Sequence, residues 1–150
     1  MEVTNMAASN ANSIISTVEQ WFKKLPNLPK NIQEFIVMVA PWAALIFGIL
    51  GVIGGISALG LFSAYSPIVM GMTYYNSGVG MVSLLLGLAS SVLLLMAFPG
   101  LNKKKMGGWN WLFWSEVVSV ISAIVIFSVG GIVFSLVGLY LVFQIKSYYK

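Results

Sequence analysis

Apolar residues along the chain gather into runs that are long enough to cross a lipid bilayer. The first run covers residues 35–62 without a charged side chain, and the second covers residues 79–98. A helix needs about 20 consecutive apolar residues to span a hydrocarbon core of about 30 Å. The two runs therefore predict two transmembrane helices. Residues 63–78, which carry Ser, Tyr, Pro, Asn and Gly, predict a loop between them, with a short interfacial helix inside this loop as the alternative.

The third apolar run is too long for one membrane helix. It extends from Trp109 to Ile145, and as one helix it would measure about 55 Å, far more than the bilayer needs. Two helices must share it. Glycine adopts turn conformations freely, so Gly130 and Gly131 predict the turn between them. We therefore predict a third span over 109–129 and a fourth over 131–147.

Polar and apolar residues alternate with a different spacing before the first span. Between residues 10 and 25 the apolar side chains recur at intervals of three and four, which indicates an amphipathic helix. This helix is too short and too polar to cross a membrane. It either lies on the membrane surface with Trp21 and Phe22 in the headgroup region, or packs against its own bundle.

These elements predict an all-α membrane protein with four transmembrane helices arranged as two hairpins. Residues 1–34 form an N-terminal segment with the amphipathic helix, and residues 35–150 form the four-helix transmembrane domain. Composition supports the class, because 59% of the residues are hydrophobic and only 8% are charged. A soluble domain has about 25% charged residues.

The lysines predict the orientation of the four spans. All eight basic residues are lysines, and with four spans all of them fall on one side of the membrane, whereas a three-span arrangement would divide them. Lys103, Lys104 and Lys105 in the middle loop are the main determinants. By the positive-inside rule, both termini face the cytoplasm.

Small residues form a stripe on each span, which is typical of helices that pack closely in lipid. We expect these stripes to pack within one chain, while a homo-oligomer or a larger membrane partner is the alternative. The packing residues are Ala44, Gly48, Gly51 and Gly55 in the first span, Ser83, Gly87 and Ser91 in the second, Ser119 in the third and Gly138 in the fourth.

Glu116 is the only acidic residue inside a predicted span. A carboxylate in the membrane is costly and indicates either a function or a polar partner. Folding the last two spans about Gly130 and Gly131 places Glu116 level with residue 145. We therefore predict a structural clasp in which Gln144 or Lys146 pairs with Glu116. A proton or cation site at Glu116 is the alternative.

Residues that commonly support catalysis are scarce. The chain has no cysteine and no histidine, and it contains no phosphate-binding loop or carboxylate pair. We expect no catalytic, cofactor or metal site, and no binding to nucleic acid. Aromatic residues near the lysines predict an interfacial belt in contact with membrane lipids. Its members are Trp109, Trp111, Trp114, Tyr148 and Tyr149.

The C-terminal third resembles a group of small four-helix bacterial integral membrane proteins. The stretches that carry the resemblance are "AFPGLNKKKMGGWNWLFWSE" (97–116) and "GLYLVFQIKSYYK" (138–150), which closes on a Phe-Gln-basic-Ser-Tyr-Tyr tail. The resemblance implies a bacterial cytoplasmic membrane and brings no activity or site residue with it.

Two functions fit these observations. The first is a non-enzymatic structural or accessory subunit that acts through helix packing. The second is a minimal channel or transporter that works as an oligomer with Glu116 as its proton or cation site. A continuous polar cavity past Ser83, Ser91, Ser119 and Glu116 would favour permeation, and a dry, filled bundle would favour the accessory role.

Overall fold

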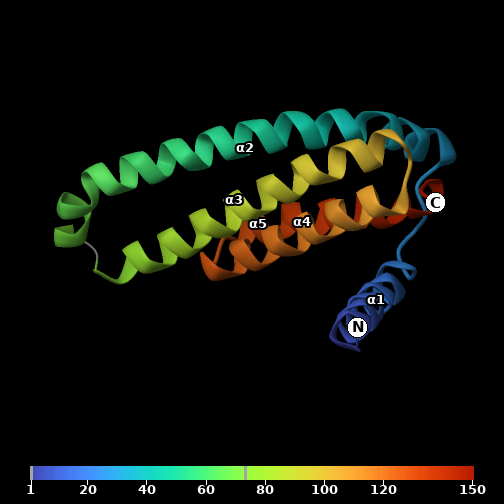
Figure 1. The fold of residues 1–150 in the computed structure, drawn as a ribbon, viewed down its shortest axis with the longest axis horizontal. Helices are drawn as coiled ribbons and strands as arrows, with labels where there is room; N and C mark the ends of the chain where they lie inside the picture. The colour runs from blue at the N-terminus through green and yellow to red at the C-terminus, as the bar shows by residue number, and fades with distance from the viewer. Residues whose placement is uncertain (1, 73) are drawn as a thin grey trace.

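The computed structural model describes the backbone of residues 2–72 and 74–150, and the side chains of residues 6–61 and 78–150. Its helices are shown in Figure 1. They are α1 (Glu2–Phe22), α2 (Lys30–Met72), α3 (Tyr74–Asn102), α4 (Met106–Val125) and α5 (Val129–Gln144), followed by a short 3-10 turn, Lys146–Tyr148. The described residues contain no strand.

Four stretches are long and apolar enough to cross a membrane, as the sequence predicts. They are Lys30–Leu61, Gly78–Asn102, Met106–Val125 and Val129–Tyr148. The molecule is therefore a polytopic membrane protein of the all-helical class. The loop predicted over residues 63–78 is wrong for most of its length, because α2 continues to Met72 and α3 begins at Tyr74. A helix satisfies its own backbone hydrogen bonds, which favours it wherever water is scarce.

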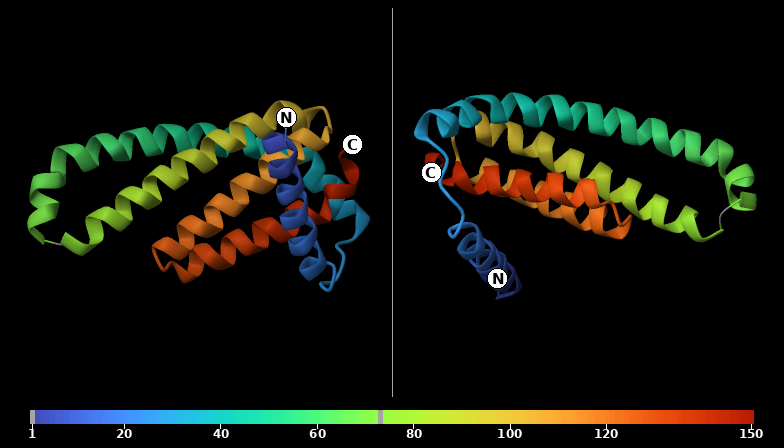
Figure 2. Two further views of the ribbon diagram at one scale, coloured as in Figure 1. Left: turned by 60° about the horizontal axis from the view of Figure 1, so that its bottom comes forward. Right: turned by 180° about the vertical axis from the view of Figure 1, so that it is seen from behind.

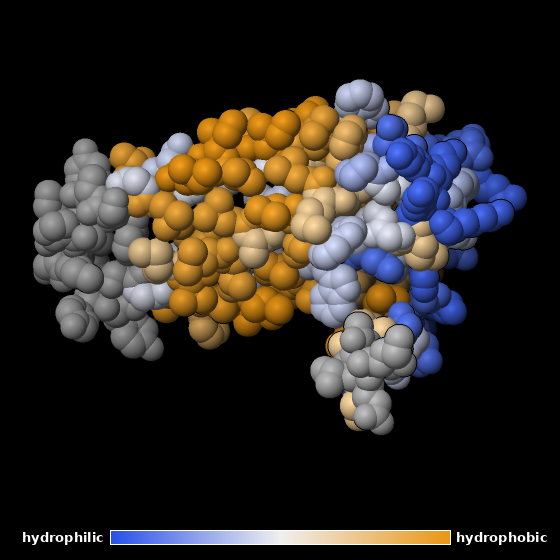
Figure 3. Space-filling model, in the orientation of Figure 1, coloured by the Kyte–Doolittle hydropathy of each residue, from blue (hydrophilic) through white to orange (hydrophobic). Residues whose placement is uncertain are grey.

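The membrane-length helices follow one another in space as they do in the chain. α3 packs along both α2 and α4, and α4 packs along α5. α1 contacts α5 and crosses the direction of the bundle steeply (Figure 2). On the face drawn in Figure 3, the hydrophilic surface of the described residues gathers at the end where α2 begins, and the body beside it is apolar. We call the end where α2 begins and α3 ends the lysine end.

Small residues let α2 approach α3 closely. A Cβ atom added at Gly48 would lie 2.7 Å from the Leu95 side chain, and one at Gly51 would overlap Ser91 Oγ. Gly55 meets Leu88 in the same way, and Ala44 is buried. This face of α2 is thus filled by side chains of the same protein.

Serines line the contact between α3 and α4. Ser90 Oγ lies 2.9 Å from Ser119 Oγ and donates to the Ser115 carbonyl at 3.0 Å. Further along, Ser83 Oγ lies 3.4 Å from Ser122 Oγ. Gly87 was expected in this seam, but it is exposed and no atom lies within 4 Å of a Cβ added there.

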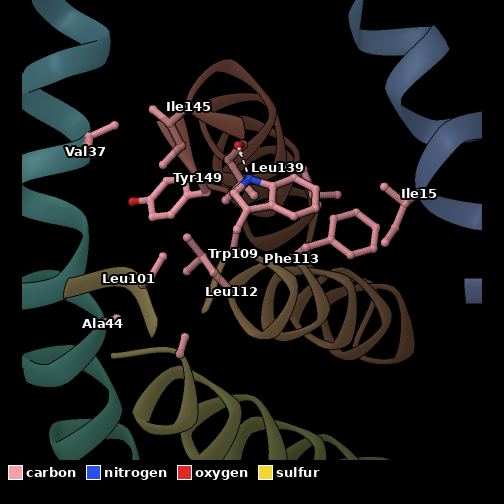
Figure 4. Close-up of a cluster of buried hydrophobic side chains, with 12 residues drawn as sticks. Ile15, Val37, Ala44, Leu101, Trp109, Leu112, Phe113, Leu139, Ile145 and Tyr149 are labelled. Atoms are coloured by element: carbon pink, nitrogen blue, oxygen red, sulfur yellow. Dashed lines mark hydrogen bonds between the residues drawn. The ribbon is translucent and has the colours of Figure 1, made fainter. Parts of the chain in front are cut away.

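The tightest packing lies at the lysine end. Trp109 and Phe113 are fully buried there and stack with ring centroids 5.6 Å apart (Figure 4). The indole N–H of Trp109 donates to the Val142 carbonyl at 2.8 Å, so the tryptophan joins α4 to α5. The belt prediction is therefore wrong for Trp109 and for Tyr149, which is also buried, because both side chains fill the core instead of facing lipid headgroups.

The turn between α4 and α5 lies before the two glycines. Phe127 has a φ of 51°, its N–H donates to Ile124 O at 3.0 Å, and the Ser128 N–H donates to Ala123 O at 2.9 Å. This is the Schellman arrangement that ends many helices. Ser128 Oγ then accepts from Gly131 N at 3.2 Å and caps α5. The predicted turn at Gly130 and Gly131 is wrong, since both glycines lie inside α5.

Candidate functional site in the membrane

The displaced turn changes which residues face each other across α4 and α5. Glu116 lies against Gly138, where an added Cβ atom would approach Glu116 Oε2 to 2.6 Å. Gln144 lies six residues beyond Gly138, about 9 Å further along the helix. The predicted clasp between Glu116 and Gln144 or Lys146 is therefore wrong, because the turn shifts the register by about two helical turns.

Gln144 and Lys146 instead join α5 to the N-terminal segment. Gln144 Oε1 accepts from the Leu28 N–H at 3.2 Å and from Gln33 Nε2 at 3.3 Å. Lys146 forms an ion pair with Glu19 of α1, and its Nζ lies 5.3 Å from the centre of the Trp109 ring. Both side chains thus hold the lysine end together.

Glu116 lines an open cleft between α2 and α5. The cleft has a volume of about 450 Å³, and its walls are mostly apolar. Ala40, Ala44 and Phe47 contribute from α2, while Phe134 and Gly138 contribute from α5. Phe134 is 83% exposed at the side of the cleft, so the opening faces the surroundings of the helix bundle rather than its interior.

The Glu116 carboxylate has no hydrogen-bond donor among the residues that the structure describes. It lies halfway along α4, where the surroundings are apolar. Placing a charged side chain at the centre of a membrane helix costs roughly 2.5–3.5 kcal/mol on insertion scales. Gly138 has no side chain and so leaves room for the carboxylate. The carboxylate thus fits sterically but has no hydrogen-bond partner among the described residues.

The serines that could continue a polar path from Glu116 mostly bind neighbouring groups. Ser119 also lines the cleft, but its hydroxyl donates to the Ser115 carbonyl at 2.9 Å. Ser91 donates to the Gly87 carbonyl at 2.8 Å and faces α2. Ser83 contacts Ser122, away from the cleft. Of the described serines, Ser119 and Ser135 line the cleft with Glu116, whereas Ser83 and Ser91 do not, so the predicted polar path is not continuous.

The chemistry that the cleft can support follows from this inventory. A single carboxylate can accept hydrogen bonds or neutralise a cation. Within the described residues, no group of three metal-binding side chains comes together. The cleft is thus suited to recognition of a positively charged or hydrogen-bond-donating group.

Two further hollows lie between α1 and α5. A cavity of about 500 Å³ is lined by polar residues that include Glu19, Lys23 and Lys146. Beside it runs an apolar groove of about 910 Å³. The hydrogen bond from Lys146 lowers the pKa of Glu19 and outweighs the opposing effect of burial, and Lys23 lowers it further. Glu19 therefore stays ionised at neutral pH.

Tyr149 borders the polar cavity, and burial raises its pKa to about 12. Its buried hydroxyl has no hydrogen-bond partner among the described residues. Of the other predicted belt residues, Trp111 is exposed, and Trp114 and Tyr148 are half-buried. Lys103, Lys104 and Lys105 are exposed in the turn before α4.

Sequence reasoning missed three features of these sites. Ser128 precedes a helix, and serine at that place is a known capping signal. The ion pair between Glu19 and Lys146 had no local signal, because it depends on where α1 docks. Trp109 had none either, since a tryptophan beside lysines is more typical of a membrane interface.

Comparisons with protein families, with curated proteins and with solved structures found no match to this chain.

Proposed function

We propose that this protein is a non-enzymatic accessory subunit of a membrane complex and that it binds a partner's transmembrane helix at the cleft between α2 and α5. The observation that carries the proposal is the Glu116 carboxylate, which lines an open apolar cleft halfway along a membrane-length helix. A lysine, arginine or other hydrogen-bond donor on the partner would offset the cost of this carboxylate.

The form of the cleft supports a helix as the occupant. Part of the cleft wall is formed by small residues, namely Ala40, Ala44 and Gly138. Small residues let membrane helices approach one another closely. A volume of about 450 Å³ suits inserted side chains. The partner helix would therefore lie along the opening and direct one polar side chain towards Glu116.

The partner is a different protein in this proposal. Between Glu34 and Lys146, the charged residues of this chain are Lys103, Lys104, Lys105 and Glu116 alone. A second copy in the same orientation therefore has no basic residue at the depth of Glu116. A partner with a basic residue in its own span supplies the missing charge.

The orientation of the subunit follows from its lysines. We place the lysine end and both termini in the cytoplasm, in a bacterial cytoplasmic membrane. α2 with α3 and α4 with α5 insert as hairpins, and α1 lies at the membrane surface. The steep crossing of α1 and its exposed Trp21 support this arrangement.

Site-specific photo-crosslinking in native membranes tests the proposal. A photoreactive residue at Phe134 samples the cleft, and one at Leu85, which is 52% exposed and lies on α3, is the control. We expect crosslinks from position 134 to a membrane protein with a basic residue in its span. Glu116→Gln should weaken that complex at least about tenfold, because the partner's charge loses its counter-ion.

A charge exchange makes the test specific. Glu116→Lys should abolish the complex, and replacing the partner's basic residue with Glu should restore it. Equal crosslinking from positions 134 and 85, or a complex unaffected by Glu116→Gln, would overturn the proposal. So would proton or cation flux in proteoliposomes that Glu116→Gln abolishes, since that result assigns Glu116 to permeation.

A further inference from the structure

We infer that the face between α1 and α5 binds an anionic glycerophospholipid. The phosphate occupies the polar cavity beside Lys23 and Lys146, and the acyl chains lie in the adjoining apolar groove. This site includes α1, which does not line the Glu116 cleft, and Glu116 does not line this site, so the inference can be tested independently of the proposed partner.

The two hollows form one continuous surface. Phe22 of α1 lines both the polar cavity of about 500 Å³ and the apolar groove of about 910 Å³. Phe22 stacks on Phe143 with centroids 5.4 Å apart, which fixes α1 against α5 at the junction. A ligand that fills both hollows must therefore have a polar part joined to an apolar part.

The polar cavity carries a net positive charge. Its lining contains Lys23 and Lys146 but only one acidic residue, Glu19. The side chains of Asn27 and Ser147, which also line the cavity, add hydrogen-bond donors. Basic pockets at the ends of membrane helices bind acidic lipid headgroups. The phosphate of an anionic lipid matches this combination of charge and donors.

The apolar groove runs from the lysine end towards the middle of α5. Trp21 and Leu25 line it near the end of α1, and its α5 wall extends from Tyr140 back to Val133, about 10 Å of helix. Val133 and Trp21 are exposed large hydrophobic residues. Acyl chains would cover this surface, while the headgroup stays at the same level as the lysines.

A lipid fits this surface better than a soluble anion, because a polar hollow and an apolar hollow are joined there. A free phosphate would use only the polar cavity and leave the groove empty. The cavity alone holds an ion pair between Glu19 and Lys146, with Lys23 at 3.3 Å from the same carboxylate. Acyl contacts therefore have to supply part of the affinity, and the ligand is a lipid.

Native mass spectrometry of the full chain, delipidated in mild detergent, tests the inference. The probes are phosphatidylglycerol, phosphatidylcholine with the same acyl chains, and inorganic phosphate. We expect phosphatidylglycerol to bind at least about tenfold more tightly than phosphatidylcholine, and phosphate not to compete. Lys23→Gln combined with Lys146→Gln should weaken phosphatidylglycerol binding roughly 30-fold, since each lysine contributes to attraction of an anionic lipid.

Three further variants separate the causes. Lys23→Gln alone leaves the Glu19–Lys146 pair intact and should still weaken phosphatidylglycerol binding severalfold. Lys103→Gln removes a lysine at the same end that does not line the cavity, and binding should be unchanged. Leu136→Trp fills the groove and should weaken the binding of both lipids. Equal affinity for the two lipids, competition by phosphate, or equal losses for Lys23→Gln and Lys103→Gln would each overturn the inference.

Discussion

The two turns that flank α4 have the same backbone conformation and very different surroundings. Each places a residue other than glycine in the left-handed region, with φ of 50° at Lys104 and 51° at Phe127. In each, two consecutive N–H groups bond back to the last turn of the preceding helix. The same local motif therefore closes α3 at the lysine end and α4 at the opposite end.

The surroundings decide how firmly each turn is held. The C-terminus packs beside Lys104, where Lys150 N donates to Lys104 O at 3.1 Å and Met106 N donates to Lys150 O at 2.9 Å. Phe127 is 88% exposed, and its turn has the Ser128 cap as its main added support. Backbone geometry therefore sets the helix register at both turns, while tertiary contacts concentrate stability at the lysine end.

The largest effect should come from the contact between α3 and α4 at the lysine end. A Cβ atom added at Gly108 would overlap the backbone of Gly100 and Leu101, which cannot move aside like a flexible side chain. We expect Gly108→Ala to destabilise the protein by about 3 kcal/mol, at the upper end of overpacking effects. Thermal unfolding in detergent measures the change.

Gly107→Ala is the matched control for this substitution. Gly107 is exposed, and no atom lies within 4 Å of a Cβ added there. Alanine is the better helix former, so this variant should be unchanged or up to about 1 kcal/mol more stable. If the two variants unfold at the same temperature, the contact between α3 and α4 at the lysine end is not tightly packed.

Trp109→Phe should have the next largest effect. It removes the indole N–H bond to the Val142 carbonyl and leaves a void in a fully buried site. We expect a loss of about 2 kcal/mol from these two causes together. Trp111→Phe, at a side chain that is 40% exposed, should change the unfolding temperature little. Equal losses of stability for both variants would show that Trp109 lies in the interfacial belt, as the sequence predicts, and not in the core.

The sequence was sufficient for the class of fold because hydrocarbon imposes strict requirements. Long apolar runs must become helices, and the total length of apolar chain requires four of them. The positions of the turns were not accessible in the same way. Glycine is the usual residue in the left-handed region, so the turn was predicted at Gly130 and Gly131, whereas Phe127 and Ser128 form it.

That error in one turn accounts for the error at the candidate site. The register between α4 and α5 differs from the predicted one by about two helical turns. Glu116 therefore lies against Gly138 in an apolar cleft and not beside the polar side chain of Gln144. The prediction that Glu116 is unusual depended only on its charge within a span, and charge is read directly from the sequence. Its partner depended on the register, which requires the tertiary structure.

Glycine substitutions at the two turns test whether both backbones are left-handed. The left-handed conformation costs a residue with a Cβ roughly 1–2 kcal/mol, and glycine avoids this cost. Lys104→Gly and Phe127→Gly should each stabilise the protein by about 1 kcal/mol after the extra flexibility of the unfolded chain is subtracted. Lys104→Ala and Phe127→Ala retain the cost and are the controls. A glycine variant that is less stable than its alanine counterpart would show that its turn is not left-handed.

The smallest effect concerns the docking of α1 at the lysine end. Its ion pair between Glu19 and Lys146 is partly exposed and should contribute about 1 kcal/mol or less. Because the hydrogen bond from Lys146 lowers the pKa of Glu19 below its ordinary value of 4.5, this contribution is present above pH 4.5 and is lost as the pH falls through the lowered pKa. Distances between spin labels on α1 and α5 should therefore lengthen as the pH falls through this lowered pKa, and Glu19→Gln should remove the dependence. An unchanged distance from pH 7 to pH 3, or the same acid response in Glu19→Gln, would show that apolar contacts alone hold α1 at the end where the helices are otherwise most firmly joined.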